Sequence, residues 1–154
     1  MRSVLDLTTL IEKEWDAFLF GAGKGVATTL GWVSYHTLRS KGSAAGFPDR
    51  TCWRERLLFA ELKTESNTPS DRQVAFMSGM AKAGAEVYLW RPSDYPEAAN
   101  VLGTRATFDA HAGTLTSPTL GTWKPRSLWL ANGARRDANC APGAQLANEI
   151  EAAR

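Results

Sequence analysis

The sequence has few of the residues from which zinc sites and disulfide frameworks are built. Its 154 residues contain two histidines and two cysteines, Cys52 and Cys140. The cysteines lie far apart in the chain, with no C-x-x-C pair and no matched histidine pair, so the sequence predicts neither a zinc site nor a disulfide. We therefore expect two reduced thiols, as is typical of a cytoplasmic protein.

Long apolar runs are also lacking. No stretch approaches the roughly 20 apolar residues that a helix needs to span a bilayer. The N-terminus, MRSVLDLTTL, has neither the charged start nor the long apolar run of a signal peptide. From these absences we expect a protein that stays in the cytoplasm and has no membrane partner.

The chain lacks a strong excess of charge of either sign. Its formal net charge is +2, and residues 1–103 hold 12 basic and 12 acidic side chains. Composition alone therefore does not predict a nucleic-acid partner. An apolar share of 44% and a charged share of 22% are typical of a globular domain. A chain of this length is long enough to bury a core as one domain.

Apolar periodicity predicts an α/β fold, or α+β in stricter terms, with a mixed central sheet of about four strands flanked by helices. A helix is expected over residues 4–30, with a kink, a break or a close helix contact where Gly21, Gly23 and Gly25 weaken it. The remaining elements are expected in this order: a strand at 32–36, a hairpin of 51–54 and 57–63, a helix from 70 to 83, a strand at 85–90 and a short helix at 94–102.

After Leu102 the periodic pattern fades. Residues 103–143 are rich in glycine, proline, threonine, serine and alanine, so we expect mostly loop or weak structure there. We divide the chain into a domain over 1–103 and an extension over 104–154, with a final helix at 144–153. The extension is partly irregular, but Trp123, Leu128, Trp129 and Leu130 are expected to pack onto the domain or onto a second copy.

The stretch over residues 46–63, GFPDRTCWRERLLFAELK, carries the chemistry. Alternate side chains of a strand share a face, so Glu61 and Lys63 project together, roughly 7 Å apart. A hairpin over the intervening residues would bring Asp49 beside this pair. Carboxylates are ligands for Mg²⁺ or Mn²⁺, and a lysine can position a water. The pattern predicts a hydrolytic site for phosphodiesters.

These residues, P-D followed later by E-x-K, resemble the PD-(D/E)xK nuclease superfamily, and the wider context is similar to its stand-alone, phage-type VRR-NUC family. The similarity covers about residues 12–102. It rests on an ordered set: GWVSYHT at 31–37, SAAGFPD at 43–49, AELK at 60–63, Gln73, and AGAEVYLWRP at 83–92.

The resemblance implies a restriction-endonuclease-like fold and a metal-dependent DNA endonuclease that uses Mg²⁺ or Mn²⁺. In the family's scheme Asp49 and Glu61 bind the metal with the backbone carbonyl of Leu62. Lys63 orients the attacking water or steadies charge on the phosphate, and Gln73 faces the site. It also implies a homodimer that acts on branched DNA such as four-way junctions, in a bacterial or phage-infected cell.

Resembling families add an acid from the first helix, and three residues compete for that place. Glu12 precedes Trp15 as the family's acid precedes an aromatic residue, whereas Glu14 is a close alternative and Asp16 a third. The spacing from either glutamate to the G-W pair is about a turn longer than expected. The helix dipole favours acids at this position in any case, so the choice among the three stays open.

Several polar residues near the site in sequence are candidates for contact with DNA, because backbone phosphates attract basic and hydroxyl side chains. Each is also an ordinary solvated side chain when considered alone. Two alternatives to a junction nuclease remain: a non-catalytic DNA- or partner-binding protein with the same fold, and a restriction-type or trimming nuclease. The candidate DNA-binding residues are His36, Arg39, Ser40, Lys41, Ser43 and Arg54, with Arg56 beside them.

Overall fold

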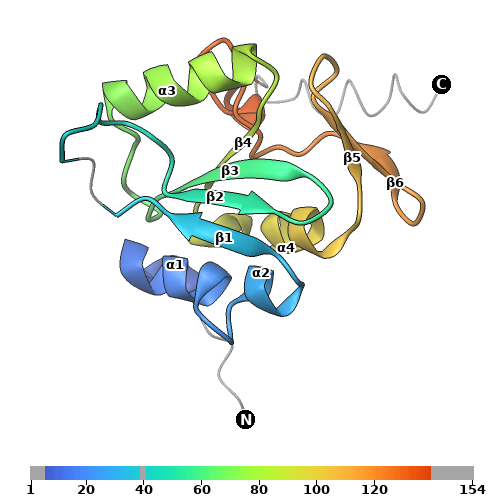
Figure 1. Cartoon of the computed structure of the whole chain (residues 1–154), viewed down its shortest axis with the longest axis horizontal. Helices are drawn as coiled ribbons and strands as arrows, with labels where there is room; N and C mark the ends of the chain where they lie inside the picture. The colour runs from blue at the N-terminus through green and yellow to red at the C-terminus, as the bar shows by residue number, and fades with distance from the viewer. Residues whose placement is uncertain (1–5, 39–40, 140–154) are drawn as a thin grey trace.

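A four-stranded mixed sheet forms the centre of the computed structural model, which describes residues 6–38 and 41–139 (Figure 1). The strands lie in the order β1-β2-β3-β4, and β1, β2 and β3 are antiparallel neighbours whereas β3 and β4 run parallel. This arrangement confirms the predicted α/β fold. The strands are β1 (Val33–His36), β2 (Arg50–Trp53), β3 (Leu57–Leu62) and β4 (Glu86–Trp90).

Helices cover both faces of this sheet (Figure 1). α3 (Asp71–Lys82) connects the parallel strands and lies on one face. On the other face lie α1 (Glu12–Phe20), α2 (Val26–Thr29) and α4 (Tyr95–Gly103). Short 3₁₀ turns occur at η1 (Leu7–Thr9), η2 (Pro92–Asp94) and η3 (Arg136–Asn139).

The glycine-rich segment divides the first helical region, as the sequence predicted. α1 ends at Phe20 and α2 begins at Val26, with a turn between them. The chain folds back so closely that a Cβ atom on Gly25 would lie 2.5 Å from the backbone nitrogen of Gly21. Gly31 then ends α2 with a φ of +88°, a conformation that other residues rarely adopt.

α3 also begins and ends where local chemistry predicts. Ser70 caps its first turn by accepting a hydrogen bond from the backbone N–H of Gln73, and the Gln73 side chain accepts one from the N–H of Ser70. This reciprocal pair satisfies two donors that the helix itself leaves free. Gly84, at φ +97°, follows the last turn and redirects the chain into β4.

The prediction of loop over residues 103–143 is wrong for its central part. A three-stranded antiparallel sheet is formed by β5 (Thr107–Asp109), β6 (Thr114–Ser117) and β7 (Gly121–Trp123). Asp109 closes the first turn by accepting hydrogen bonds from the N–H groups of His111 and Ala112. Threonine is polar, as in loops, but its branched side chain also favours strands, and here that preference prevails.

The extension shares the core of the sheet. Leu115 and Leu128 are buried in the cluster that contains Trp15 and Trp90. Trp129 packs in a second cluster, formed by buried residues of α3 and β4. Trp123 and Leu130 pack against the first cluster while partly exposed. The expectation that these four apolar residues pack onto the domain is confirmed, and the domain boundary at residue 103 stays a prediction.

The extension also covers the outer edge of β4. The N–H of Leu89 donates to the carbonyl of Ser127 over 3.2 Å, and the N–H of Trp129 donates to the carbonyl of Val87 over 2.8 Å. With β3 on one side and this segment on the other, all five residues of β4 are buried. An edge that would otherwise remain open is therefore paired.

Two further expectations concern the cysteines and the membrane. Cys52 is a buried free thiol, and burial raises its pKa to about 12. Within the described ranges, no helix is long and apolar enough to cross a membrane. Cys140 and the expected helix over 144–153 lie outside the described residues.

Candidate active site

The residues predicted to carry chemistry lie at one end of the central sheet. Asp49 immediately precedes β2, while Glu61 and Lys63 lie at the end of β3. Glu12, the first residue of α1, and Gln73, in the first turn of α3, come to the same place from opposite faces of the sheet. In Figure 1 the N-terminal ends of α1 and α3 flank this end of the sheet.

Asp49 is fixed by the hairpin that the sequence predicted. β2 and β3 pair with Arg50 opposite Ala60, which places Asp49 next to the end of β3. Its carboxylate oxygen Oδ2 accepts a hydrogen bond from the backbone N–H of Leu62 over 2.9 Å. One oxygen is thus held by the strand, which sets the orientation of the other.

Glu61 is the most unusual side chain of this group, because its carboxylate is 0% exposed. Oε1 accepts a hydrogen bond from Gln73 Nε2 over 2.7 Å and forms an ion pair with Lys63 Nζ over 3.3 Å. Oε2 is buried and has no hydrogen-bond partner among the described residues. Burial, together with the charge of Asp49, raises the pKa of Glu61 to about 8, although Lys63 acts in the opposite direction.

Lys63 links the two sides of the site. Its ammonium lies 3.3 Å from Glu61 and 4.0 Å from Glu12 Oε2, and its side chain is 11% exposed. An ammonium that faces two carboxylates in a largely buried setting is held in one position. Gln73 is fixed as well, since its amide oxygen caps α3 while its amide nitrogen binds Glu61.

The three N-terminal acids have different surroundings. Glu12 faces Lys63, and burial raises its pKa despite the opposing charge of that lysine. Glu14 instead accepts a hydrogen bond from the N–H of Ile11 at the start of α1. Asp16 forms a two-point ion pair with Arg50, over 2.9 and 2.7 Å. Of the three, Glu12 contacts Lys63, whereas Asp16 lines the same pocket but is paired with Arg50.

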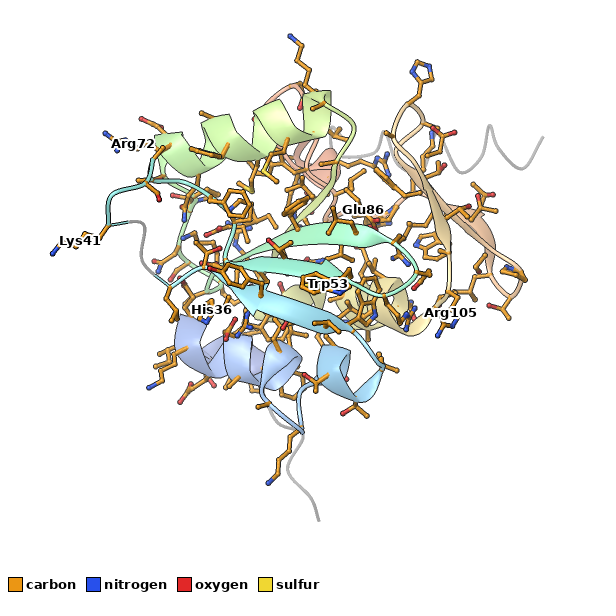
Figure 2. All side chains as sticks on the ribbon, in the orientation of Figure 1. His36, Lys41, Trp53, Arg72, Glu86 and Arg105 are labelled. Carbon is orange, nitrogen blue, oxygen red and sulfur yellow. The ribbon has the colours of Figure 1, made fainter. Side chains whose placement is uncertain are left out.

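A pocket of ≈ 350 Å³ opens beside these residues, and it is lined by Asp49, Glu12, His36 and Leu62 together with Lys13 and Asp16. His36 therefore lies at the rim of the site. Lys41 and Ser43 are exposed in the following loop. Figure 2 shows Lys41 and Arg72 projecting beyond the end of the sheet where His36 lies. Arg39 and Ser40 lie outside the described residues.

Arg54 does not join the site, contrary to the expectation from its place in the sequence. It follows β2 at the far end of the hairpin, where it stacks over Trp32 at 4.7 Å and binds Glu55. Arg56 lies beside it and binds Glu86. Figure 2 shows Glu86 away from the end at which His36 lies. Both guanidinium groups are committed to the fold.

Sequence reasoning did not identify Lys13 or Arg50 as residues of this region. Arg50 fixes α1 to the sheet through Asp16 and also donates to Ser34 Oγ over 3.2 Å. Lys13 lines the pocket from α1. The one sequence signal that could have placed Arg50 near the site is its position directly after the Pro-Asp pair. No sequence signal marks Lys13.

The side-chain oxygens at the site are of the kind that binds a divalent cation, but they are few. In the part of the chain that the structure describes, no group of three or more His, Cys, Asp or Glu side chains is arranged to hold a metal ion. The site offers two carboxylates, of Asp49 and Glu61, and the free buried oxygen of Glu61 is a hard ligand without a donor. A backbone carbonyl and water would have to complete the coordination.

The chain matches no protein-family model, no curated protein and no solved structure. The geometry of the site and the ordered motifs of the sequence are therefore the features that bear on its function.

Proposed function

We propose that this chain is a metal-dependent nuclease of the PD-(D/E)xK type, similar to the VRR-NUC family, that hydrolyses phosphodiester bonds in DNA. One observation carries the proposal: the fully buried carboxylate of Glu61 has one oxygen without a donor, and it lies beside Asp49 and Lys63. A buried charge is costly unless a cation compensates it, and here two carboxylates share one ammonium.

Asp49, Glu61 and the carbonyl of Leu62 are the groups that would hold Mg²⁺ or Mn²⁺. When bound, such an ion lowers the pKa of water and stabilises negative charge on the transferring phosphorus. The remaining residues position the reaction. The backbone N–H of Leu62 orients Asp49, and Gln73 orients Glu61.

Lys63 has the chemical role of a donor. Its ammonium is held between Glu61 and Glu12, and Glu12 itself lines the pocket beside Asp49. From this position it can donate a hydrogen bond to an attacking water or to a phosphate oxygen, where negative charge develops in the transition state. Glu12 keeps the ammonium directed toward the site.

The test is cleavage of labelled linear, flapped and four-way DNA by the purified full chain in Mg²⁺, Mn²⁺ or EDTA. We expect cleavage that requires the metal and that Lys63→Ala reduces at least about a hundredfold, as for loss of a transition-state donor. Lys82→Ala, an exposed lysine at the end of α3, serves as the control and should leave the rate unchanged.

Cleavage that survives EDTA or Lys63→Ala would overturn the proposal. Binding without cleavage under every metal would favour a non-catalytic DNA-binding protein instead. A second readout is independent of activity: Mn²⁺ should raise the melting temperature of the wild type, and Asp49→Asn should reduce that shift because it removes a charged ligand. An equal shift in both proteins would place the metal elsewhere.

We further propose that the chain acts as a homodimer on branched DNA. A group of exposed apolar side chains on β1, β2 and the start of β3 supports a second copy: Tyr35 is 63% exposed, and the cross-strand row of Val33, Trp53 and Leu57 is 44 to 52% exposed. Contiguous exposed apolar surface is typical of interaction sites. Sedimentation equilibrium should give twice the chain mass, and Tyr35→Ser with Trp53→Ser should shift it toward the monomer.

A further inference from the structure

A larger groove along the edge of the sheet adjoins the pocket at the candidate site. This groove has a volume of ≈ 740 Å³ and runs between β1 and the helices α1 and α2. It shares Lys13, Asp16 and His36 with the smaller pocket that contains Asp49. The two spaces are therefore neighbours, and the candidate site lies beside one end of the groove.

One wall of the groove is the open edge of β1. The N–H of Thr37 donates to the carbonyl of Asp49, which fixes the alternation of hydrogen bonds between β1 and β2. In an antiparallel pair every second residue turns its N–H and C=O outward. Ser34 and His36 are those residues, and β1 has no neighbour other than β2 in the described sheet. Both line the groove.

The opposite wall supplies charge. Lys13 lies on the exposed side of α1, and no acidic group of the described chain lies within ion-pair distance of its ammonium. Arg50 adds a second cation, although it is already paired with Asp16. Outward N–H groups and an available ammonium are ligands for phosphate oxygens, and a positively charged groove that follows the backbone is how proteins bind single strands.

The size of the groove restricts what can enter. A space of ≈ 740 Å³ between a strand and a helix accepts a few nucleotides of one strand and is too small for a base-paired duplex. We infer that this β1-edge groove binds an unpaired DNA strand and leads it to the site, so that the substrate is DNA with a single-stranded arm. The inference rests on the proposed nuclease function and specifies its substrate class.

A steric variant tests this placement. Ala17 is exposed on α1 and lines the groove but not the smaller site pocket, so Ala17→Trp should fill the groove without touching Asp49, Glu61 or Lys63. Ala75→Trp, on the exposed face of α3, is the matched control. We measure cleavage in Mn²⁺ of one duplex with and without an unpaired arm, and the anisotropy of a labelled single strand in EDTA.

We expect the wild type to prefer the armed duplex, and Ala17→Trp to lower both cleavage of that duplex and single-strand binding by about tenfold or more, as for a lost binding segment. Ala75→Trp should change neither. A charge variant supports the same conclusion: Lys13→Glu should weaken binding and reduce the slope of log affinity against log salt by about 1, whereas the distant Lys124→Glu should not.

The outcomes separate the two proposals. Cleavage that needs Lys63 but is equal with and without the arm, or unaffected by Ala17→Trp, overturns the groove inference and leaves the nuclease proposal intact. If Ala17→Trp weakens single-strand binding but no substrate is cleaved, the groove inference stands and the nuclease proposal is overturned. If the single strand does not bind and Ala17→Trp instead dissociates a dimer, the groove holds a strand of a second copy and the inference is wrong.

Discussion

Glu61 combines complete burial with an unfinished set of hydrogen bonds. Most buried carboxylates in folded proteins are paired on both oxygens, because an unpaired charge in the interior is destabilising. Here Gln73 and Lys63 both bind Oε1 and leave Oε2 without a donor among the described residues. The side chain is therefore held in position for an additional ligand.

The raised pKa of Glu61 predicts how stability depends on pH in metal-free protein. Its folded value of about 8 lies above the ordinary 4.5, so the folded state retains a proton that the unfolded chain loses. The free energy of unfolding should be highest below about pH 4.5 and fall as the pH rises through about 8. Glu61→Gln, which stays neutral, should reduce this dependence in urea unfolding with EDTA. Identical pH profiles would contradict the prediction.

Gln73 has two roles that can be separated by substitution. Gln73→Glu keeps an oxygen for the N–H of Ser70 but places a carboxylate against Glu61, whereas Gln73→Ala loses both contacts. Above about pH 8, where Glu61 is ionised, we expect Gln73→Glu to destabilise the metal-free protein by about 1–3 kcal/mol, since the buried Glu61 carboxylate then lacks its donor.

The pH dependence of that loss identifies its cause. In acid the new carboxyl is protonated and can donate, so the cost of Gln73→Glu should shrink, while the cost of Gln73→Ala should change less. Thermal unfolding of both variants at two pH values provides the measurement. Equal losses for the two variants at both pH values would mean that the amide contact with Glu61 contributes nothing.

At the scale of elements, the loop that contains Gly46 and Phe47, just before β2, packs closely against α3. Gly46 has a φ of +114°, and a Cβ atom there would lie 2.6 Å from the backbone carbonyl oxygen of Arg72. Phe47 also packs edge-to-face on Phe59 and Phe76. The position of Asp49 relative to Gln73 therefore depends on how closely this loop approaches the helix.

Gly46→Ala should test that dependence. Both the backbone conformation and the close contact oppose a side chain, so we expect a loss of about 1–3 kcal/mol in stability and reduced cleavage. Gly79→Ala, in the same helix, is the control: its Cβ would meet nothing within 4 Å, and it should stabilise the protein by about 1 kcal/mol. Chemical denaturation measures both. A neutral Gly46→Ala would show that the loop adjusts freely.

Local chemistry made most elements predictable from the sequence. The break between α1 and α2, the hairpin and the cap of α3 each follow from glycine, apolar or capping residues at short range. The sheet over residues 107–123 was missed because alternating threonines resemble a polar loop. The positions of Glu12 and Arg54 depend on packing between segments far apart in the chain, which one sequence does not specify.

At the scale of the whole molecule, the described part of the extension belongs to the same packed unit as the sheet. Trp129 is 5% exposed, and its indole N–H donates to Ser78 Oγ over 3.0 Å. Trp129→Ala should cost about 3–5 kcal/mol, since it leaves a large cavity between β4 and α3.

The control is Leu120→Ala, in the same extension, whose side chain is 55% exposed and whose loss should cost clearly less. Calorimetry should show one unfolding transition for the wild type and a lower single transition for Trp129→Ala. Two separate transitions in the wild type would mean that the extension unfolds as an independent domain.

The candidate site draws on four separate stretches of chain, which contribute Glu12, Asp49, the Glu61–Lys63 strand end and Gln73. No single stretch contains all of these groups. They come together only when the β2–β3 hairpin is formed and both α1 and α3 are packed against the sheet. If the proposed function holds, a chain that lacks any one of these stretches would have an incomplete set of groups and would not cleave DNA.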